Sequence, residues 1–289
     1  MSRASTRFLD TEVPDVGPEK ARFHVLPVPY EKTVSYGNGT AKGPAAIIAA
    51  SGQLERWDGA SDPGKEGIYT WLAIDCSGKA ERVLEDISIA VNGILRIKKL
   101  PVVLGGEHTV TWGVIKGYLD AGVKDFGVVQ IDAHADLRDA YEGDKYSHAS
   151  VMRRVVEAGI PLVQLGVRAF SEEEKDARKK HGVKAFDAQE LVPRNKSAIR
   201  LPGGFPEKVF FTLDVDGIDP SVLPATGTPV PGGLGWYQTL GLFESVARQR
   251  RIIGFDVMEF APIEGFHAFD FAAALLTYKL MGIVQRTAR

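Results

Sequence analysis

Three short segments of the sequence concentrate acidic and histidine side chains. They read GGEHT at 105–109, DAHAD at 132–136 and DVDG at 214–217. Alternate side chains of an extended chain share one face, so Asp132, His134 and Asp136 are expected to point the same way, as are Asp214 and Asp216. Ionisable groups crowded on one face repel one another and are costly to bury unless a cation lies between them. The spacing therefore indicates a metal site.

Together the three segments offer a mixed set of ligands. The candidates are four carboxylates and two imidazoles, from His108, Asp132, His134, Asp136, Asp214 and Asp216. Such mixtures suit manganese, iron or zinc, and the excess of carboxylates without a thiolate favours manganese. Six ligands with bridging aspartates fit two cations about 3.5 Å apart that lower the pKa of a shared water. Alone, His108 could be a polar residue at a loop start, and DVDG could be a turn.

Each segment follows a short apolar run that is typical of a buried strand. Such runs occur at Phe23–Val28, Pro101–Leu104, Phe126–Ile131, Pro161–Leu165, Val209–Leu213 and Ile252–Val257. Helical patterns lie between them at Pro44–Arg56, Ala80–Ile97, Thr109–Leu119, Ala149–Ala158, Glu172–Lys180 and Thr239–Arg250, with a last amphipathic stretch at Phe269–Gln285. This alternation predicts a three-layer α/β/α sandwich on a mainly parallel sheet, in which ligands bind beyond the carboxyl ends of the strands.

Length and composition limit the function further. The chain has 289 residues, a formal net charge of -2 and one cysteine, Cys76, so an internal disulfide is excluded. We expect a polar N-terminal arm over residues 1–20 and a single catalytic domain over 21–289. Without a basic stripe, an apolar leader or an apolar run of roughly 20 residues, we expect a cytoplasmic protein that binds neither nucleic acid nor membrane.

The segments resemble the ureohydrolase family, which includes arginase and agmatinase. The matching stretches are GGEHT, DAHAD, YSHAS at 146–150, DVDGIDPSVLPATGTPVPGGL at 214–234 and DVMEFAP at 256–262. They occur in the order found in the family, and the resemblance extends from Val25 to Pro262. Glu107 and Thr109 stand where many members have Asp and Ser. Neither position is a ligand in the family, so this departure leaves the expected chemistry unchanged.

The resemblance implies a particular division of the ligands. One metal would be held by His108, Asp132, Asp136 and Asp214, and the second by Asp132, His134, Asp214 and Asp216. Asp132 and Asp214 would then bridge the two ions. The resemblance also implies two Mn²⁺ per chain, an arginase-like fold and assembly into trimers or hexamers.

Three residues are expected to act on the substrate. The resemblance assigns Glu259 to the guanidinium group, which a carboxylate can bind through two parallel hydrogen bonds. His148 could shuttle protons or bind the substrate, and Asp136 could carry a proton from the attacking water to the leaving amine. The simpler alternatives are a surface carboxylate for Glu259 and a helix-capping role for His148.

The substrate tail is the most open question. The stretch YEGDKYSHASVMRR at 141–154 is similar to the agmatinase branch, which implies conversion of agmatine to putrescine and urea. Asp139, Glu142 and Asp144 could hold the distal ammonium group, and the loop at 37–44 is expected near the pocket mouth. Guanidinobutyrate, guanidinopropionate and guanidine are alternative substrates. Arginine and formimidoylglutamate are less favoured, and a metal-bound pseudoenzyme is an alternative of another class.

Overall fold

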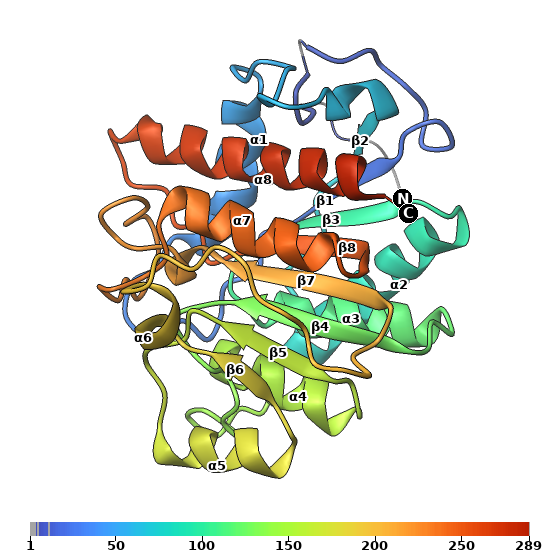
Figure 1. Ribbon diagram of the computed structural model, residues 1–289. Helices are drawn as coiled ribbons and strands as arrows, with labels where there is room; N and C mark the ends of the chain where they lie inside the picture. The colour runs from blue at the N-terminus through green and yellow to red at the C-terminus, as the bar shows by residue number, and fades with distance from the viewer. Residues whose placement is uncertain (1–3, 5, 11, 289) are drawn as a thin grey trace.

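A computed structural model describes residues 4, 6–10 and 12–288, and its centre is an eight-stranded sheet (Figure 1). The strand order is β2-β1-β3-β8-β7-β4-β5-β6, and every pairing between neighbouring described strands is parallel. The strands span β1 Phe23–Val28, β2 Ile68–Thr70, β3 Leu100–Gly105, β4 Phe126–Ile131, β5 Leu162–Leu165, β6 Lys184–Phe186, β7 Lys208–Asp214 and β8 Arg251–Met258.

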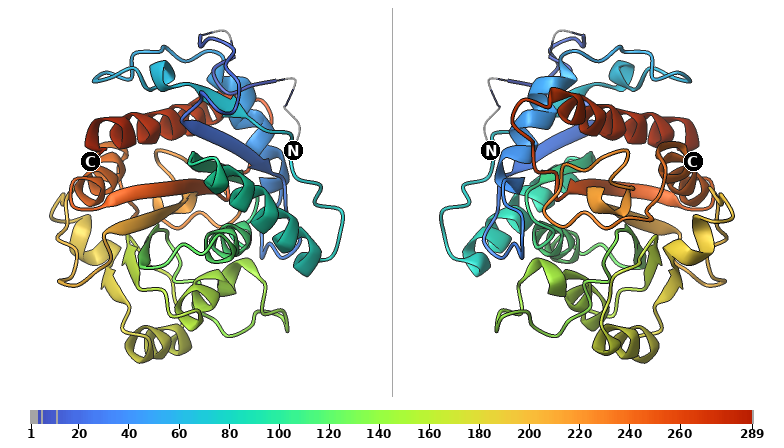
Figure 2. Two further views of the ribbon diagram at one scale, coloured as in Figure 1. Left: turned by 90° about the vertical axis from the view of Figure 1, so that its right-hand side faces the viewer. Right: turned by 90° about the vertical axis from the view of Figure 1, so that its left-hand side faces the viewer.

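Helices cover both faces of the sheet, which confirms the three-layer prediction (Figure 2). One layer contains α1 (Gly43–Ser51), α6 (Ala188–Leu191), α7 (Trp236–Ala247) and α8 (His267–Thr287). The opposite layer contains α2 (Ala80–Arg96), α3 (Val110–Asp120), α4 (Val151–Glu157) and α5 (Glu172–Lys180). A parallel sheet needs such helices as crossover connections, because the chain must return to the starting end of the sheet before the next strand begins.

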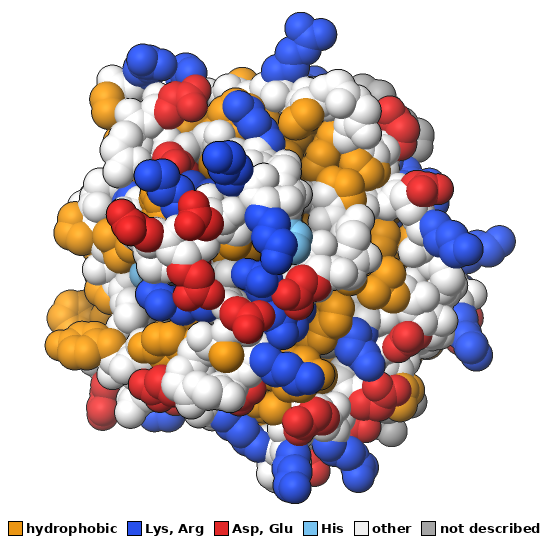
Figure 3. All heavy atoms as spheres, turned by 90° about the horizontal axis from the view of Figure 1, so that it is seen from below, with side chains coloured by type: hydrophobic (Ala, Val, Ile, Leu, Met, Phe, Trp, Pro, Cys, Tyr) orange, Lys and Arg blue, Asp and Glu red, His pale blue; other side chains and the backbone are white. Residues whose placement is uncertain are grey.

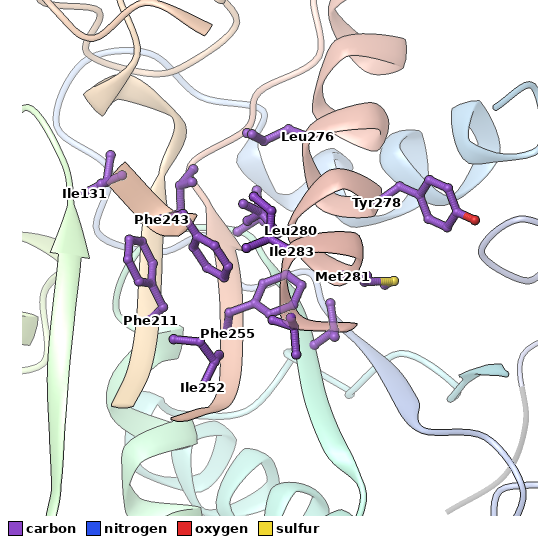
Figure 4. Close-up of a cluster of buried hydrophobic side chains, with 14 of the residues drawn as sticks. Ile131, Phe211, Phe243, Ile252, Phe255, Leu276, Tyr278, Leu280, Met281 and Ile283 are labelled. Carbon is purple, nitrogen blue, oxygen red and sulfur yellow. The ribbon is translucent and has the colours of Figure 1, made fainter. Parts of the chain in front are cut away.

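Aromatic side chains fill the space between the sheet and α7 (Figure 4). The ring centroids of Phe211 and Phe243 lie 4.5 Å apart, and those of Phe243 and Phe255 lie 5.9 Å apart. Phe211 and Phe255 belong to the adjacent strands β7 and β8, and Phe243 comes from α7. Tilted and edge-on pairs at these separations add to the free energy of burial. This packing holds in place β7, which ends at Asp214, and β8, which Glu259 follows.

The sequence located the six inner strands and missed both edges of the sheet. β2 and β6 have three residues each, which is too short for a periodic pattern. The helix boundaries also differ. α1 ends at Ser51 instead of Arg56, α7 begins at Trp236 instead of Thr239, and a 3-10 turn at His148–Ser150 precedes α4.

The N-terminal segment is part of the core, which corrects one expectation. Phe8 and Leu9 are fully buried, and Val13 is nearly so. The backbone amide of Leu9 donates to the hydroxyl of Ser51 at the end of α1, with 2.8 Å between the atoms. Burial of these apolar side chains overrides the polar average of residues 1–20. Within that segment, residues 1–3, 5 and 11 lie outside the described part of the chain.

The last helix, α8, spans His267–Thr287 and so extends beyond the predicted stretch Phe269–Gln285 at both ends. α8 has 21 residues and, by length and composition alone, could cross a membrane. However, 56 % of its most apolar window is buried inside the protein, as expected for a helix of the core. α8 packs on α1 and α7. On the face of the molecule seen from below in Figure 3, acidic and basic side chains are interspersed.

Candidate metal centre

The candidate site residues lie at the carboxyl ends of four adjacent central strands. In spatial order these strands are β3, β8, β7 and β4. His108 follows β3, Glu259 follows β8, and Asp214 ends β7. The segment 132–136 follows β4 directly. Because the strands are parallel, residues distant in sequence meet at their carboxyl ends. The structure therefore brings all six predicted ligands together.

The first cluster surrounds the imidazole of His108. Its Nδ1 atom lies 3.1 Å from Asp132 Oδ2, 3.1 Å from Asp136 Oδ2 and 3.2 Å from Asp214 Oδ2. All four side chains are buried. Among the described residues none forms a properly directed hydrogen bond to this Nδ1, although its Nε2 lies 2.8 Å from the hydroxyl of Thr212. A buried nitrogen facing three carboxylate oxygens is an arrangement that a cation would satisfy.

The second cluster surrounds His134. Its Nδ1 atom lies 2.9 Å from Asp216 Oδ2 and 3.6 Å from Asp132 Oδ1. The two oxygens of Asp132 thus face different histidines, as a bridging carboxylate requires. Asp214 is adjacent through the chain, since the backbone amide of Asp216 donates to Asp214 Oδ1 over 2.9 Å. The resemblance assigns Asp132 and Asp214 to both ions. Of these two, Asp132 has one oxygen near each histidine, whereas Asp214 has its contact with His108.

The backbone holds these side chains in place. The amide of His134 donates to Asp132 Oδ1 over 2.5 Å, and the amide of Ala133 donates to Asp216 Oδ1 over 2.9 Å. Asp136 has a φ of 52°, in the left-handed region that a side chain rarely adopts. Strain of this kind persists where the surrounding structure fixes the conformation, and it concentrates at functional sites.

Arg168 fixes the loop after β7. One of its terminal nitrogens donates to the carbonyl of Asp216 over 2.6 Å and to that of Val230 over 2.7 Å. Its other terminal nitrogen donates to the carbonyl of Gly217 over 3.3 Å. A guanidinium group has five N–H donors in a rigid plane, so it can join several carbonyls at once. Sequence analysis did not identify Arg168, because its partners are remote along the chain.

The electrostatics of the cluster favour a bound cation. Burial, together with the charge of Asp132, raises the pKa of Asp136 to about 7. Burial and the charges of Asp216 and Asp132 also raise the pKa of Asp214 well above its usual value. Burial opposes the charged form of His134, but Asp216 and Asp132 overcome it and raise its pKa to about 12. Carboxylic acids that keep their protons because they are buried close together would lose those protons when a divalent cation binds. The donor set therefore fits two metal ions.

Glu259 lies beside the clusters in a small buried cavity. His148, Asp136, Asp214 and Asp216 line the same cavity. Glu259 has a φ of 62°, and its backbone amide donates to the carbonyl of Gly106 over 2.8 Å. Burial, with the charge of Glu107, raises the pKa of Glu259 well above its usual value. A guanidinium ion would restore the ionised form through charge-assisted hydrogen bonds.

His148 faces the cavity and is held by two hydroxyl groups. Its Nδ1 lies 3.1 Å from Thr33 Oγ1, and its Nε2 lies 2.9 Å from Ser35 Oγ. The Thr33 hydroxyl donates to Glu107 Oε1 over 2.6 Å, and the backbone amide of Thr33 donates to Glu107 Oε2 over 2.7 Å. Because the Thr33 hydroxyl uses its one hydrogen in the bond to Glu107, it can only accept a hydrogen bond from His148. This assigns the imidazole proton to Nδ1. Nε2 is then the basic nitrogen.

Burial lowers the pKa of His148 to about 4, and the positive charges of His108 and His134 add to the shift. The imidazole is therefore neutral at pH 7. It can accept a proton or a hydrogen bond at Nε2, as a substrate-contacting residue must.

An open cleft of about 330 Å³ continues outward from the two clusters. Its outer lining includes Arg138, Tyr141, Phe170 and Glu174. Sequence reasoning missed all four, because Arg138, Tyr141 and Phe170 lie in loops without a periodic signal and Glu174 belongs to a highly charged helix, α5. Gly37 lines the inner cavity, as expected for the loop at 37–44.

The three acidic residues considered for the substrate tail are not part of this lining. Asp139 instead pairs with Arg154 over 3.3 Å, and Asp144 accepts the backbone amide of Tyr146 over 2.7 Å. Glu142 is exposed in a turn with a φ of 52°. The loop therefore offers the tail one basic side chain, Arg138, rather than carboxylates.

Comparison with known proteins gives the site a context. The sequence profile described as "Arginase family" matches residues 21–282. The N(1)-aminopropylagmatine ureohydrolase of Synechocystis sp. is 39 % identical over 89 % of this chain and 87 % of its own length. The agmatinase of Pyrococcus horikoshii is 32 % identical over 97 % of this chain and 98 % of its own length.

The same fold is found among solved structures. The agmatine ureohydrolase of Thermoplasma volcanium superimposes with a TM-score of 0.83 and 28 % identity, covering 98 % of this chain and 95 % of its own. Fold, cluster and relatives together define a hydrolase of arginase fold, a class that depends on two metal ions. The chain belongs to the arginase family and is a ureohydrolase.

Proposed function

We propose that this ureohydrolase releases urea from agmatine or a closely similar guanidino compound, leaving an amine, and that it uses two Mn²⁺ ions. The observation that carries this proposal is the position of Glu259, whose carboxylate shares one small cavity with both histidine–carboxylate clusters. We further propose that residues 21–289 act as one catalytic domain in a cytoplasmic homo-oligomer, a trimer or a hexamer.

The residues divide the chemical work as follows. His108, Asp132, Asp136 and Asp214 would hold one ion, and Asp132, His134, Asp214 and Asp216 the other. When bound, two divalent cations supply Lewis acidity and lower the pKa of a shared water.

Glu259 orients the guanidinium plane so that its carbon faces the site of the attacking water. The water adds to that carbon, and the bond from the carbon to the alkyl nitrogen breaks. The water oxygen loses both of its protons as it becomes the carbonyl oxygen of urea, and the amine departs as an ammonium ion. Asp136 would carry the first of these protons to the departing nitrogen. The neutral His148 offers Nε2 to an N–H group of the substrate or to a proton in transit.

The relatives support a tail of the agmatine type. Relatives named N(1)-aminopropylagmatine ureohydrolase are 39 % and 36 % identical to this chain over most of its length, and one named agmatinase is 32 % identical. In the outer cleft, the rings of Tyr141 and Phe170 offer apolar surface to an alkyl tail. Each ring also lies against an arginine, with Arg138 5.6 Å from the centroid of Tyr141 and Arg178 4.5 Å from that of Phe170. The buried carboxylate of Glu174 adds negative charge at the same place. The positive charge of Arg138, in the same cleft, opposes binding of an ammonium group.

N(1)-aminopropylagmatine is the second candidate substrate. The Synechocystis relative carries that name, and the cleft continues beyond the metal cavity with room for a longer tail. Arginine is less favoured, because agmatine and N(1)-aminopropylagmatine, the compounds in the relatives' names, both lack its α-carboxylate.

Urea release from Mn²⁺-loaded protein tests the proposal directly. The panel comprises agmatine, N(1)-aminopropylagmatine, guanidinobutyrate, guanidinopropionate, guanidine and arginine at equal concentration. One of the first two compounds should exceed arginine by roughly 100-fold in kcat/KM, which corresponds to about 3 kcal/mol. A preference for guanidinobutyrate would remove the agmatine assignment and leave the ureohydrolase chemistry intact. Absence of urea from every compound would support the pseudoenzyme alternative.

A further inference from the structure

Two glutamines interrupt the apolar run of adjacent central strands. Gln130 in β4 and Gln164 in β5 are direct register partners, and both are fully buried. Neither lines the metal cavity or the substrate cleft. A buried amide is costly unless all of its groups are hydrogen-bonded, so this pair needs an explanation that the proposed chemistry does not provide.

The orientation of the Gln164 amide follows from its neighbours. Arg178 Nε, which can only donate, lies 2.7 Å from one end of the amide and therefore fixes that end as the oxygen. The carbonyl of Ala135, which can only accept, lies 2.7 Å from the other end and fixes it as nitrogen. Two independent partners thus demand the same orientation. The second N–H of Gln164 then donates to Gln130 Oε1 over 2.6 Å.

The orientation of Gln130 follows in turn. With its oxygen accepting from Gln164, its Nε2 points to Asp132 and donates to Oδ2 over 2.7 Å. A second acceptor, the carbonyl of His134, lies 3.4 Å from the same nitrogen. Every bond in the series runs in one direction, from Arg178 through the two amides to the carboxylate of Asp132.

We propose that Arg178, Gln164 and Gln130 form a positioning chain that sets the rotation of the Asp132 carboxylate and so increases metal affinity. This inference rests on the proposed metal centre. A neutral amide bonded to Asp132 Oδ2 leaves the negative charge on the carboxylate and holds its two oxygens toward His108 and His134. Arg178, on α5, is a positioning residue, because it acts on the metal ligand only through the amides.

The test measures the dissociation constant of Mn²⁺ by titration calorimetry on metal-free protein. Gln130→Met should weaken Mn²⁺ binding by about 10-fold or more, as loss of a partner behind a metal ligand typically does. Arg178→Met should weaken it in the same direction by a smaller factor. The double variant should bind as Gln130→Met alone, because the chain is already broken at its last bond.

Asp187→Asn is the matched control. Arg178 forms an ion pair with Asp187 over 3.1 Å, and this substitution removes that pair while leaving the bond from Arg178 Nε to Gln164. Its Mn²⁺ affinity should equal that of the unmodified protein. Arg178 also lies 4.5 Å from the ring centroid of Phe170 in the substrate cleft, so the measurement is made without substrate.

The outcomes separate the positioning chain from the metal centre itself. Unchanged affinity in Gln130→Met, or full additivity of the two substitutions, would overturn the chain while the metal centre stands. An effect of Asp187→Asn equal to that of Arg178→Met would also overturn it, since the ion pair would then be the cause. Failure of the unmodified protein to bind Mn²⁺ would overturn the metal proposal instead. Urea unfolding of each metal-free variant identifies losses caused by global destabilisation.

Discussion

The carboxylate of Glu259 accepts a hydrogen bond from the backbone amide of His108, with 2.7 Å between Glu259 Oε1 and the nitrogen. The proposed guanidinium-binding residue is thereby tied to the segment that carries a proposed metal ligand. Movement of either group would displace the other. If the two residues have the proposed roles, this hydrogen bond would help to hold the guanidinium carbon at a fixed distance from the metal site.

Glu259→Gln should separate substrate binding from metal binding. The amide oxygen can still accept from the His108 amide, so metal content should be unchanged. Loss of the negative charge removes a charge-assisted pair with the guanidinium, and kcat/KM should fall by about 100-fold or more, or about 3 kcal/mol. Steady-state urea release and elemental analysis measure the two quantities. Unchanged kinetics would show that Glu259 does not contact the substrate.

Asp132→Asn and Asp214→Asn should abolish binding of both ions. Each of these carboxylates would contact both cations, whereas Asp216 would contact one. Asp216→Asn should therefore keep about one ion per chain after dialysis, and activity should be lost in all three. Elemental analysis gives the ratio of metal to chain. Asp139→Asn is the control, because that side chain is 70 % exposed and lies outside both clusters. Full metal content in Asp132→Asn would refute bridging.

Arg138→Gln should change the preference for the substrate tail. Arg138 lines the outer cleft, where its charge repels an ammonium tail and attracts a carboxylate tail. Its removal should raise kcat/KM for agmatine and lower it for guanidinobutyrate, changing their ratio by about 10-fold at low salt. Arg154→Gln is a charge-matched control, because Arg154 pairs with Asp139 and is absent from the cleft lining. An equal effect of both substitutions would mean that only net charge matters.

Acid should destabilise the fold partly through His24. Burial lowers the pKa of this histidine to about 4 from its ordinary 6.5. Its Nδ1 accepts from Trp71 Nε1 over 3.1 Å, and its Nε2 lies 2.9 Å from the carbonyl of Pro18, so the neutral ring satisfies both partners. Between pH 6.5 and about 4 the unfolded chain binds a proton that the folded chain does not. The free energy of unfolding should therefore fall as pH falls through this window, by up to about 3 kcal/mol.

His24→Gln isolates that contribution, because glutamine can accept from Trp71 and donate to Pro18 without titrating. Urea unfolding of both proteins at several pH values gives the difference in stability. The advantage of the unmodified protein should shrink as pH falls from 6.5 to 4. A difference independent of pH would show that His24 is not the titrating group.

The inner fold could be predicted because buried parallel strands leave continuous apolar runs. Phe126–Ile131 has the same bounds in the sequence pattern and in the structure. β6, by contrast, is Lys184–Phe186, an edge strand whose residues are at least partly exposed, so it lacks that signal. In the stretch Lys175–Lys180, the sequence pattern predicts exposure for a residue that is buried. Its charge indicates a solvated helix face, yet Arg178 within it is buried against Gln164.

The expected ligands are together in the structure because their spacing reflects two simple rules, the alternation of side chains and the common edge of parallel strands. The rest of the site depends on tertiary contacts. Thr33 and Ser35 reach His148 from a loop after β1, and Phe170 enters the cleft from the segment before α5. No local pattern marks such residues, because their neighbours in space are remote in sequence.

The order of the strands also determines when the protein can first assume its final form during synthesis. β8 and β7 occupy the middle of the sheet, between β3 and β4, yet they follow the other six described strands in the sequence and are therefore synthesised after them. Until then β3 and β4 each have one open side, and Asp214, Asp216 and Glu259 do not yet exist. A nascent chain can assemble the two outer halves of the sheet early. It can join them, and could hold the proposed pair of ions, only after β7 and β8 have been translated.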